Sequence, residues 1–179
     1  MNTRMEFYIK NRPRLAKPYH MKGIGLPNVY LLNGVEIEND PDYGELVTIA
    51  DLQNLHHAIG FSILTKLEPM TGAELRFLRK QMRLTQEAVA HSLHVNVQTV
   101  ANYEKGKTAN LGPADPMMRV IYAMHVLPED ERRELVDAIL DVMPSSRPKP
   151  KVSEAMRRKI AGRWHGDGQG MAARRWGET

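Results

Sequence analysis

Apolar residues recur at helical spacing through the second half of the chain, in short stretches separated by turn-forming residues. One stripe runs from Leu75 through Leu78 to Met82, and Thr71 can cap the helix that carries it. Further on, Asp115 can cap a helix that starts with Pro116, because proline suits the first helical position. The pattern predicts five consecutive helices, over residues 71–82, 85–93, 97–105, 115–125 and 129–143.

The first half has a different pattern, in which β-branched and aromatic residues form short runs. Asn33-Gly34 separates two of these runs, and Asn-Gly is a strong signal for the type I′ turn of a β-hairpin. A third strand is expected at 46–49. Asp51 can then cap a helix that is predicted to run to about residue 67, with apolar residues at Leu52, Leu55, Ile59 and Ile63.

Composition divides the chain into four parts. Residues 1–18 are polar and basic with two prolines, which predicts an extended basic arm. A small β+α module is expected at 19–68, followed by the helical domain at 69–144. Residues 145–179 are rich in Ser, Pro, Lys, Arg and Gly, a composition that predicts a basic, disordered tail.

Positive charge is concentrated in three places, although the net charge is only +4. Residues 1–20 carry a net +4, residues 71–112 a net +3 and residues 145–179 a net +6, whereas 21–70 and 113–144 are acidic. A basic middle segment flanked by basic ends favours a polyanionic partner.

Several classes of function are disfavoured. The chain has no cysteine, which excludes disulfides, a cysteine-ligated zinc and a thiol nucleophile. No apolar run approaches the ~20 residues needed to span a bilayer, so we expect a cytoplasmic protein without a membrane partner. No phosphate-binding glycine loop or catalytic triad is evident, and the adjacent His56 and His57 cannot easily face one ion on a helix. We therefore expect no enzymatic activity, no cofactor and no metal.

The segment from Leu75 to Lys107 carries the most specific signal. It contains Arg79, the pair Thr85-Gln86, and an aromatic-Glu-x-Gly-Lys sequence at 103–107. At these positions the chain resembles the Cro/C1 (Xre) family of phage-repressor-type regulators. The resemblance implies a mainly α fold: a five-helix, lambda-repressor-like DNA-binding domain, here preceded by a small β-hairpin/helix module.

The resemblance also implies roles for individual residues. Arg79 and Glu104 would form a structural pair that locks the third helix to the first, and Gln86, next to Thr85, would grip a phosphate at a helix N-terminus. Helix 97–105 would read bases in the major groove of double-stranded DNA, and two lysines would contact phosphates. The expected DNA-binding residues are Thr85, Gln86, Asn96, Val97, Gln98, Thr99, Asn102, Lys105 and Lys107. The family usually has glycine where this chain has His94, and a left-handed backbone there would cost histidine more.

More than one function is compatible with this sequence. The leading hypothesis is a dimeric repressor, and the alternative is an antitoxin that binds a toxin protein and regulates its own operon. The layout is similar to antitoxins of the motility-quorum-sensing type, but the four zinc-binding cysteines of those proteins are missing. An adaptor that binds another regulator is a third possibility.

Two segments also have two interpretations each. Helix 129–143 could be part of the core or a dimer seam, and the basic tail could be a solvated terminus or a second phosphate-binding segment.

Overall fold

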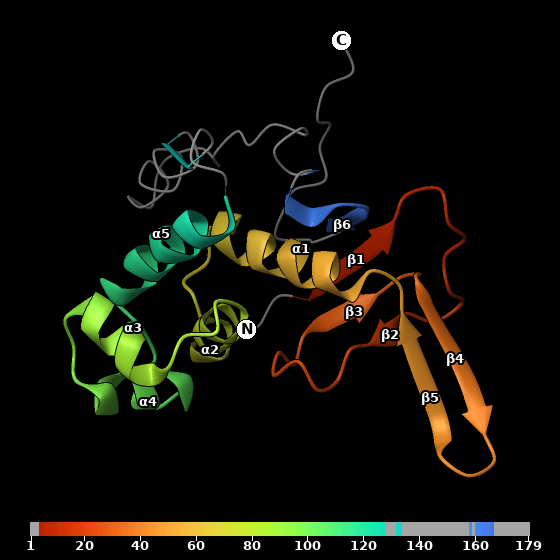
Figure 1. Ribbon diagram of the computed structural model, residues 1–179, viewed down its shortest axis with the longest axis horizontal. Coiled ribbons are helices and arrows are strands. Elements are labelled where there is room, and N and C mark those ends of the chain that lie inside the picture. Colours follow the sequence, from red (N-terminus) through yellow and green to blue (C-terminus); the bar gives the residue numbers. More distant parts are fainter. Residues whose placement is uncertain (1–3, 128–131, 134–157, 159, 167–179) are drawn as a thin grey trace.

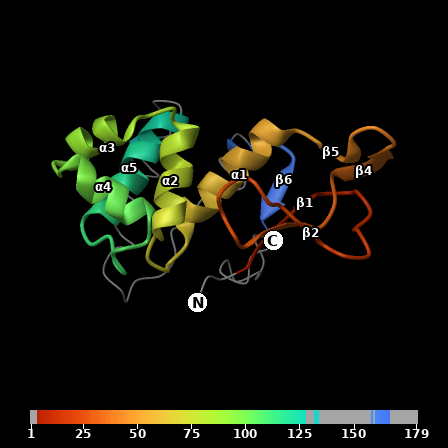
Figure 2. The ribbon, with the colours of Figure 1, turned by 90° about the horizontal axis from the view of Figure 1, so that it is seen from below.

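The computed structural model describes residues 4–127, 132–133, 158 and 160–166. A helical part and a sheet part lie at opposite ends of the molecule, and helix α1 (Leu52–Thr65) runs between them (Figures 1 and 2). No helix among these residues is long and apolar enough to cross a membrane. The predicted helix at 129–143 lies almost wholly outside the described residues, so a fifth helix of the DNA-binding domain stays a prediction.

Four helices of the second half form where the sequence predicts them: α2 (Gly72–Gln81), α3 (Gln86–Leu93), α4 (Val97–Glu104) and α5 (Ala114–Val126). Thr71 caps α2 in a reciprocal capping box with Glu74. Side chains also cap the next two helices, from Thr85 on α3 and Asn96 on α4. These local signals fix the helix boundaries before any packing is considered.

The apolar stripes of these helices close on a common core. Its fully buried members include Leu75 and Leu78 of α2, Val100 of α4 and Met118 and Tyr122 of α5. Each such side chain removed from water contributes roughly 1.5–3 kcal/mol. The short helices, which are marginal alone, are therefore held by this shared core.

Helix α1 is anchored to the helical part at its C-terminal end. The Arg119 guanidinium of α5 donates to the carbonyls of Ile63, Leu64 and Lys66 at distances of 2.8–2.9 Å. The Arg119 Nε also donates to Asp115 at 2.6 Å, and both side chains are buried. This network satisfies carbonyls that a helix end leaves without partners.

Two predicted caps are wrong. Asp115 is not an N-cap, because α5 already begins at Ala114, and the Asp115 carboxylate accepts from the Met70 N–H and the Arg119 Nε. Asp51 has a left-handed backbone and makes no capping hydrogen bond to α1. Its carboxylate accepts instead from the Asn54 amide at 3.0 Å.

The N-terminal part is a four-stranded sheet with strand order β2-β3-β1-β6. Strand β1 (Met5–Ile9) pairs in parallel with β3 (Val29–Leu31), which pairs antiparallel with β2 (Tyr19–His20). The described part of the predicted arm therefore contains a central strand, and its alternation of buried and half-buried residues is that of a strand with one covered face. The prolines and positive charges of residues 1–18 led the sequence analysis to predict an arm and not this strand.

The fourth strand comes from the other end of the chain. Strand β6 (Trp164–Gly166) pairs antiparallel with β1. The Trp164 side chain is fully buried, and its Nε1 donates to the carbonyls of Ala50 and Asp51 at 3.0 and 3.2 Å. The prediction of a disordered tail is therefore wrong for residues 160–166, where one tryptophan supplies a large buried surface. The rest of the tail lies outside the described residues.

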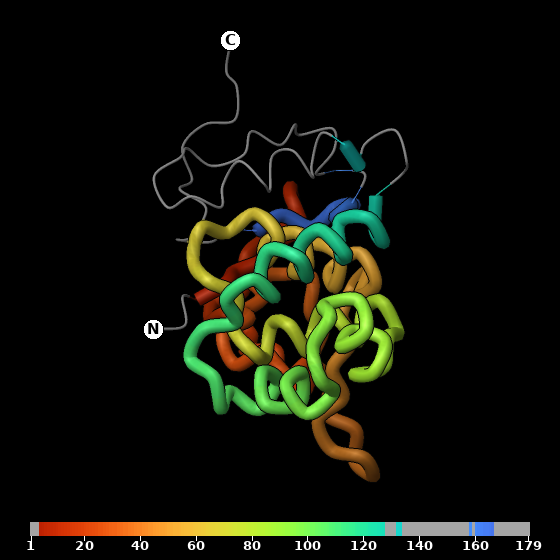
Figure 3. Tube along the Cα trace, turned by 90° about the vertical axis from the view of Figure 1, so that its left-hand side faces the viewer, coloured from red at the N-terminus to blue at the C-terminus, as the bar shows by residue number. Residues whose placement is uncertain are grey.

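The predicted Asn-Gly hairpin does not form, although the strands around it do. Gly34 has a φ of +73°, as a type I′ turn requires, but β3 and β4 (Val35–Asp40) belong to different sheets. The buried Asn33 side chain binds the backbone of β1 instead, bonding the N–H and carbonyl of Ile9 at 2.7 and 3.0 Å. The hairpin is formed by β4 and β5 (Gly44–Ile49), a strand that the sequence predicts. Figure 3 shows this two-stranded ribbon projecting from the body of the molecule.

Candidate nucleic-acid interface

Helix α4 is the element that presents the predicted base-reading residues. The Asn96 side chain accepts from the Gln98 N–H at 2.8 Å, which starts the helix. Val100 on its inner side is fully buried and fixes the rotation of the helix on the core. With this rotation the side chains of Asn96, Val97 and Gln98 are exposed to solvent, and those of Thr99 and Asn102 are half-buried.

The exposed row contains amide and methyl groups. Val97 is 40% exposed, a high fraction for an apolar residue on a short helix. The Gln98 side-chain amide donates to the side-chain oxygen Oδ1 of Asn102 at 3.2 Å, so the two amides lie side by side one helical turn apart. Such a row can offer both donors and acceptors to a flat polar edge, together with a methyl contact.

An ion pair between two largely buried side chains ties α4 to α2. The Arg79 guanidinium approaches the Glu104 carboxylate at both oxygens, with Nε to Oε1 at 2.5 Å and Nη2 to Oε2 at 3.0 Å. The Glu104 side chain is only 4% exposed. Arg79 also donates to the Leu84 carbonyl at 2.8 Å. One guanidinium of α2 therefore binds the end of α4 through a bidentate contact and the α2–α3 loop through a single hydrogen bond.

Gln86 is drawn into the same cluster. Its amide donates to the Glu104 Oε2 at 2.9 Å. Burial alone would raise the pKa of Glu104, but hydrogen bonds from Arg79 and Gln86, and the nearby positive charges of Arg79 and Arg76, lower that pKa below its ordinary value. The carboxylate is thus held ionised, as the pair requires.

Other predicted residues lie at the edges of this surface. Thr85 is exposed and caps α3 through a bond from the Ala88 N–H. Lys105 and Lys107 are exposed after α4, and the Lys107 N–H donates to the Asn102 carbonyl at 3.0 Å. Lys105 and Lys107 therefore place positive charge beside the polar row, and neither forms an ion pair within the described part of the structure.

The turn between α3 and α4 has a left-handed backbone at His94. His94 has φ 52° and ψ 41°, in the left-handed region, and its N–H donates to the Ala90 and His91 carbonyls. Such a conformation costs a non-glycine residue on the order of 1 kcal/mol. The chain keeps the turn in spite of this cost.

The sequence prediction missed one cation. Arg76 is exposed on α2, one turn before Arg79, and lies close enough to Glu104 to affect its pKa. Its spacing of three residues from Arg79 would have indicated a shared helix face. Among the described residues, no group of three or more His, Cys, Asp or Glu side chains could hold a metal ion.

Comparison with known proteins agrees with this geometry over the same segment. A family model described as "Helix-turn-helix" matches residues 75–112, which span α2 to the loop before α5. The match supports a regulator of the Cro/C1 (Xre) type and indicates a DNA-binding protein. No curated protein and no solved structure matches the chain.

Proposed function

We propose that this protein is a sequence-specific, double-stranded-DNA-binding transcriptional regulator, a dimeric repressor that places α4 in the major groove. The observation that carries the proposal is the surface of α4. Its rotation is fixed by a buried valine and a bidentate ion pair, and its outer side presents amides and a methyl group within the matched helix-turn-helix segment.

The chemistry of the outer side favours A·T base pairs. Glutamine and asparagine bond the N6 and N7 atoms of adenine bidentately, and an apolar group can contact the thymine methyl. Gln98 and Asn102 supply the amides, and Val97 supplies the methyl groups. No arginine lies between Asn96 and Asn102, so guanine contacts contribute less to the specificity.

Phosphate contacts would come from the residues around α4. Lys105 and Lys107 are exposed beyond its C-terminus, and Arg76 is exposed on α2. Gln86 and Thr85 stand at the N-terminus of α3, where backbone N–H groups and the helix dipole attract an anion. Such contacts set the position of the protein on the duplex and do not read its sequence.

A two-fold dimer would read two related half-sites, and its binding over a promoter would repress transcription. The test is selection of bound duplexes from a random pool by the full-length protein. We expect enrichment of an inverted repeat rich in A·T pairs. A variant with Val97, Gln98 and Asn102 all changed to alanine keeps the charges of the surface and is the matched control. Equal enrichment by both proteins, or none by either, would contradict the proposal.

A further inference from the structure

The β4–β5 ribbon is acidic and exposed along most of its length. Its strands are paired over six positions, from Val35 opposite Ile49 to Asp40 opposite Gly44. No lysine or arginine occurs between Lys22 and Lys66. The ribbon and its turn carry five carboxylates and no cation: Glu36, Glu38, Asp40, Asp42 and Glu45.

The pairing register sorts these residues by face. Because paired residues share a face of the ribbon, Glu36 and Glu38 lie with Asp40 on one face, whereas Ile37 lies with Val47 on the other. Three large apolar side chains of the ribbon are exposed: Ile37 (49%), Tyr43 (82%) and Leu46 (44%). A free two-stranded ribbon is at best marginally stable in water. This one exposes both carboxylates and apolar side chains to solvent.

A basic loop lies at the same end of the molecule. The basic loop is residues 10–22, which run from the end of β1 through the short strand β2 to the turn after it. It carries no acidic residue and five cations: Lys10, Arg12, Arg14, Lys17 and Lys22. Both views place this loop and the ribbon at the end opposite α3 and α4 (Figures 1 and 2). The five positive charges of the loop equal in number the five negative charges of the ribbon.

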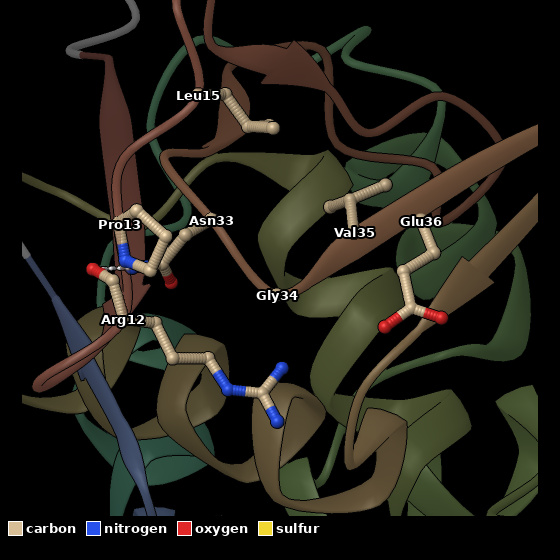
Figure 4. A pocket seen from close by; sticks show the side chains of 7 residues that line it. All are labelled: Arg12, Pro13, Leu15, Asn33, Gly34, Val35 and Glu36. Atoms are coloured by element: carbon tan, nitrogen blue, oxygen red, sulfur yellow. Dashed lines mark hydrogen bonds between the residues drawn. The ribbon is translucent and has the colours of Figure 1, made fainter.

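The loop and the ribbon meet at a pocket of about 310 Å³. Arg12 and Glu36 line it from opposite sides, below the apolar Leu15 and Val35 (Figure 4). Both charged side chains are exposed, and the structure gives no ion pair between them or from either to another described residue. Each is thus available to an opposite charge that comes from outside the chain.

We propose that this end of the molecule is a dimer interface, in which the acidic ribbon of each copy lies against the basic loop of the other. A two-fold interface must be self-complementary, so that residue i meets j and j meets i. Adjacent patches of equal and opposite charge meet that requirement. Ribbon-to-ribbon pairing would instead place like charges opposite each other, which is destabilising.

The interface leaves both α4 surfaces uncovered, because it lies at the far end of each copy. The inference names the contact surface of the dimer proposed above. Its test measures association without DNA, so it can fail while DNA recognition by α4 stands.

The experiment uses two charge reversals in the full-length chain, studied by sedimentation equilibrium. The first variant combines Glu36→Lys with Glu38→Lys, and the second combines Arg12→Glu with Lys17→Glu. Each alone should weaken association by on the order of tenfold or more, as expected for close charge pairs. An equimolar mixture of the two should form heterodimers. The control, Glu68→Lys with Glu87→Lys, raises the net charge by as much as the first variant does, at exposed sites elsewhere, and should associate like the unmodified protein.

Because the chain has no cysteine, a second measurement uses mild substitutions. Arg12→Cys and Glu36→Cys proteins, when mixed under oxidising conditions, should give a disulfide-linked heterodimer more readily than either gives a homodimer. Association that both reversals and the control affect equally would overturn the proposal. So would an unmodified protein that remains monomeric at every concentration, or a mixture that forms no heterodimer.

Discussion

Replacing Arg79 with alanine should destabilise the helix-turn-helix more than any other single change of an exposed or half-exposed charge. The substitution leaves the Glu104 carboxylate, which is only 4% exposed, with the Gln86 amide as its remaining side-chain partner. It also removes the bond to the Leu84 carbonyl.

The expected size follows from the burial of the pair. Breaking a buried ion pair by removing one partner costs about 3–5 kcal/mol, and the 13% exposure of Arg79 favours the lower end, about 3 kcal/mol. For a chain of this length 1 kcal/mol shifts the Tm by roughly 2–4 °C, so the Tm should fall by roughly 6–12 °C. Because α4 loses its anchor, binding should weaken for every DNA sequence together.

The assay is thermal unfolding followed by circular dichroism, arranged as a double-mutant cycle. Arg79→Ala, Glu104→Ala and the double variant are compared, and contact between the residues should make the double variant lose less than the sum of the singles. Arg76→Ala is the matched control, since that arginine is exposed and forms no ion pair with another described residue. A Tm for Arg79→Ala within about 2 °C of the unmodified protein, or strictly additive losses, would refute the reasoning.

Three further predictions concern other parts of the fold. Trp164→Ala should lower the free energy of unfolding by about 3–5 kcal/mol in denaturant titrations, and Trp164→Phe by less; a loss below about 1 kcal/mol would mean that β6 contributes little. His94→Gly should raise stability by roughly 0.5–1 kcal/mol because it relieves the left-handed backbone, whereas His91→Gly inside α3 should lower it; equal signs would contradict this reasoning. Burial and the charge of the neighbouring His57 lower the pKa of His56 below its ordinary value of 6.5. The contribution of the neutral His56 to the free energy of unfolding should therefore be fully present above pH 6.5 and be lost as the pH falls through the lowered pKa of the folded state. His56→Gln should flatten that pH dependence, and an unchanged profile would exclude the residue as its source.

The helical half could be predicted from the sequence because its signals are local. Capping side chains at Thr71, Thr85 and Asn96 lie within three residues of the backbone groups that they satisfy. The boundaries of α2, α3 and α4 therefore follow from short windows of sequence. The juxtaposition of Arg79 and Glu104 came from the resemblance to a known family, since nothing in the spacing of residues 25 apart indicates contact.

The N-terminal half was harder because its contacts are long-range. Strand β1 pairs with β6, more than 150 residues away in sequence, and Trp164 binds carbonyls 113 and 114 residues earlier. The Asn33-Gly34 signal describes a local backbone conformation, and Gly34 has it. The strands on either side of it, β3 and β4, nevertheless join different sheets, because the Asn33 side chain bonds to β1. Contacts between residues far apart in the sequence therefore determine which strands pair.

The central claim, that α4 reads bases, is tested most directly by the relative affinities of Gln98→Ala for single-base variants of the selected operator. The account predicts that discrimination at one A·T pair falls by about 1–3 kcal/mol while the other positions keep theirs. Lys107→Ala, the control, should weaken all duplexes together and reduce the slope of log affinity against log salt by about 0.9. If Gln98→Ala left every relative affinity unchanged, α4 would not be reading DNA in the orientation proposed.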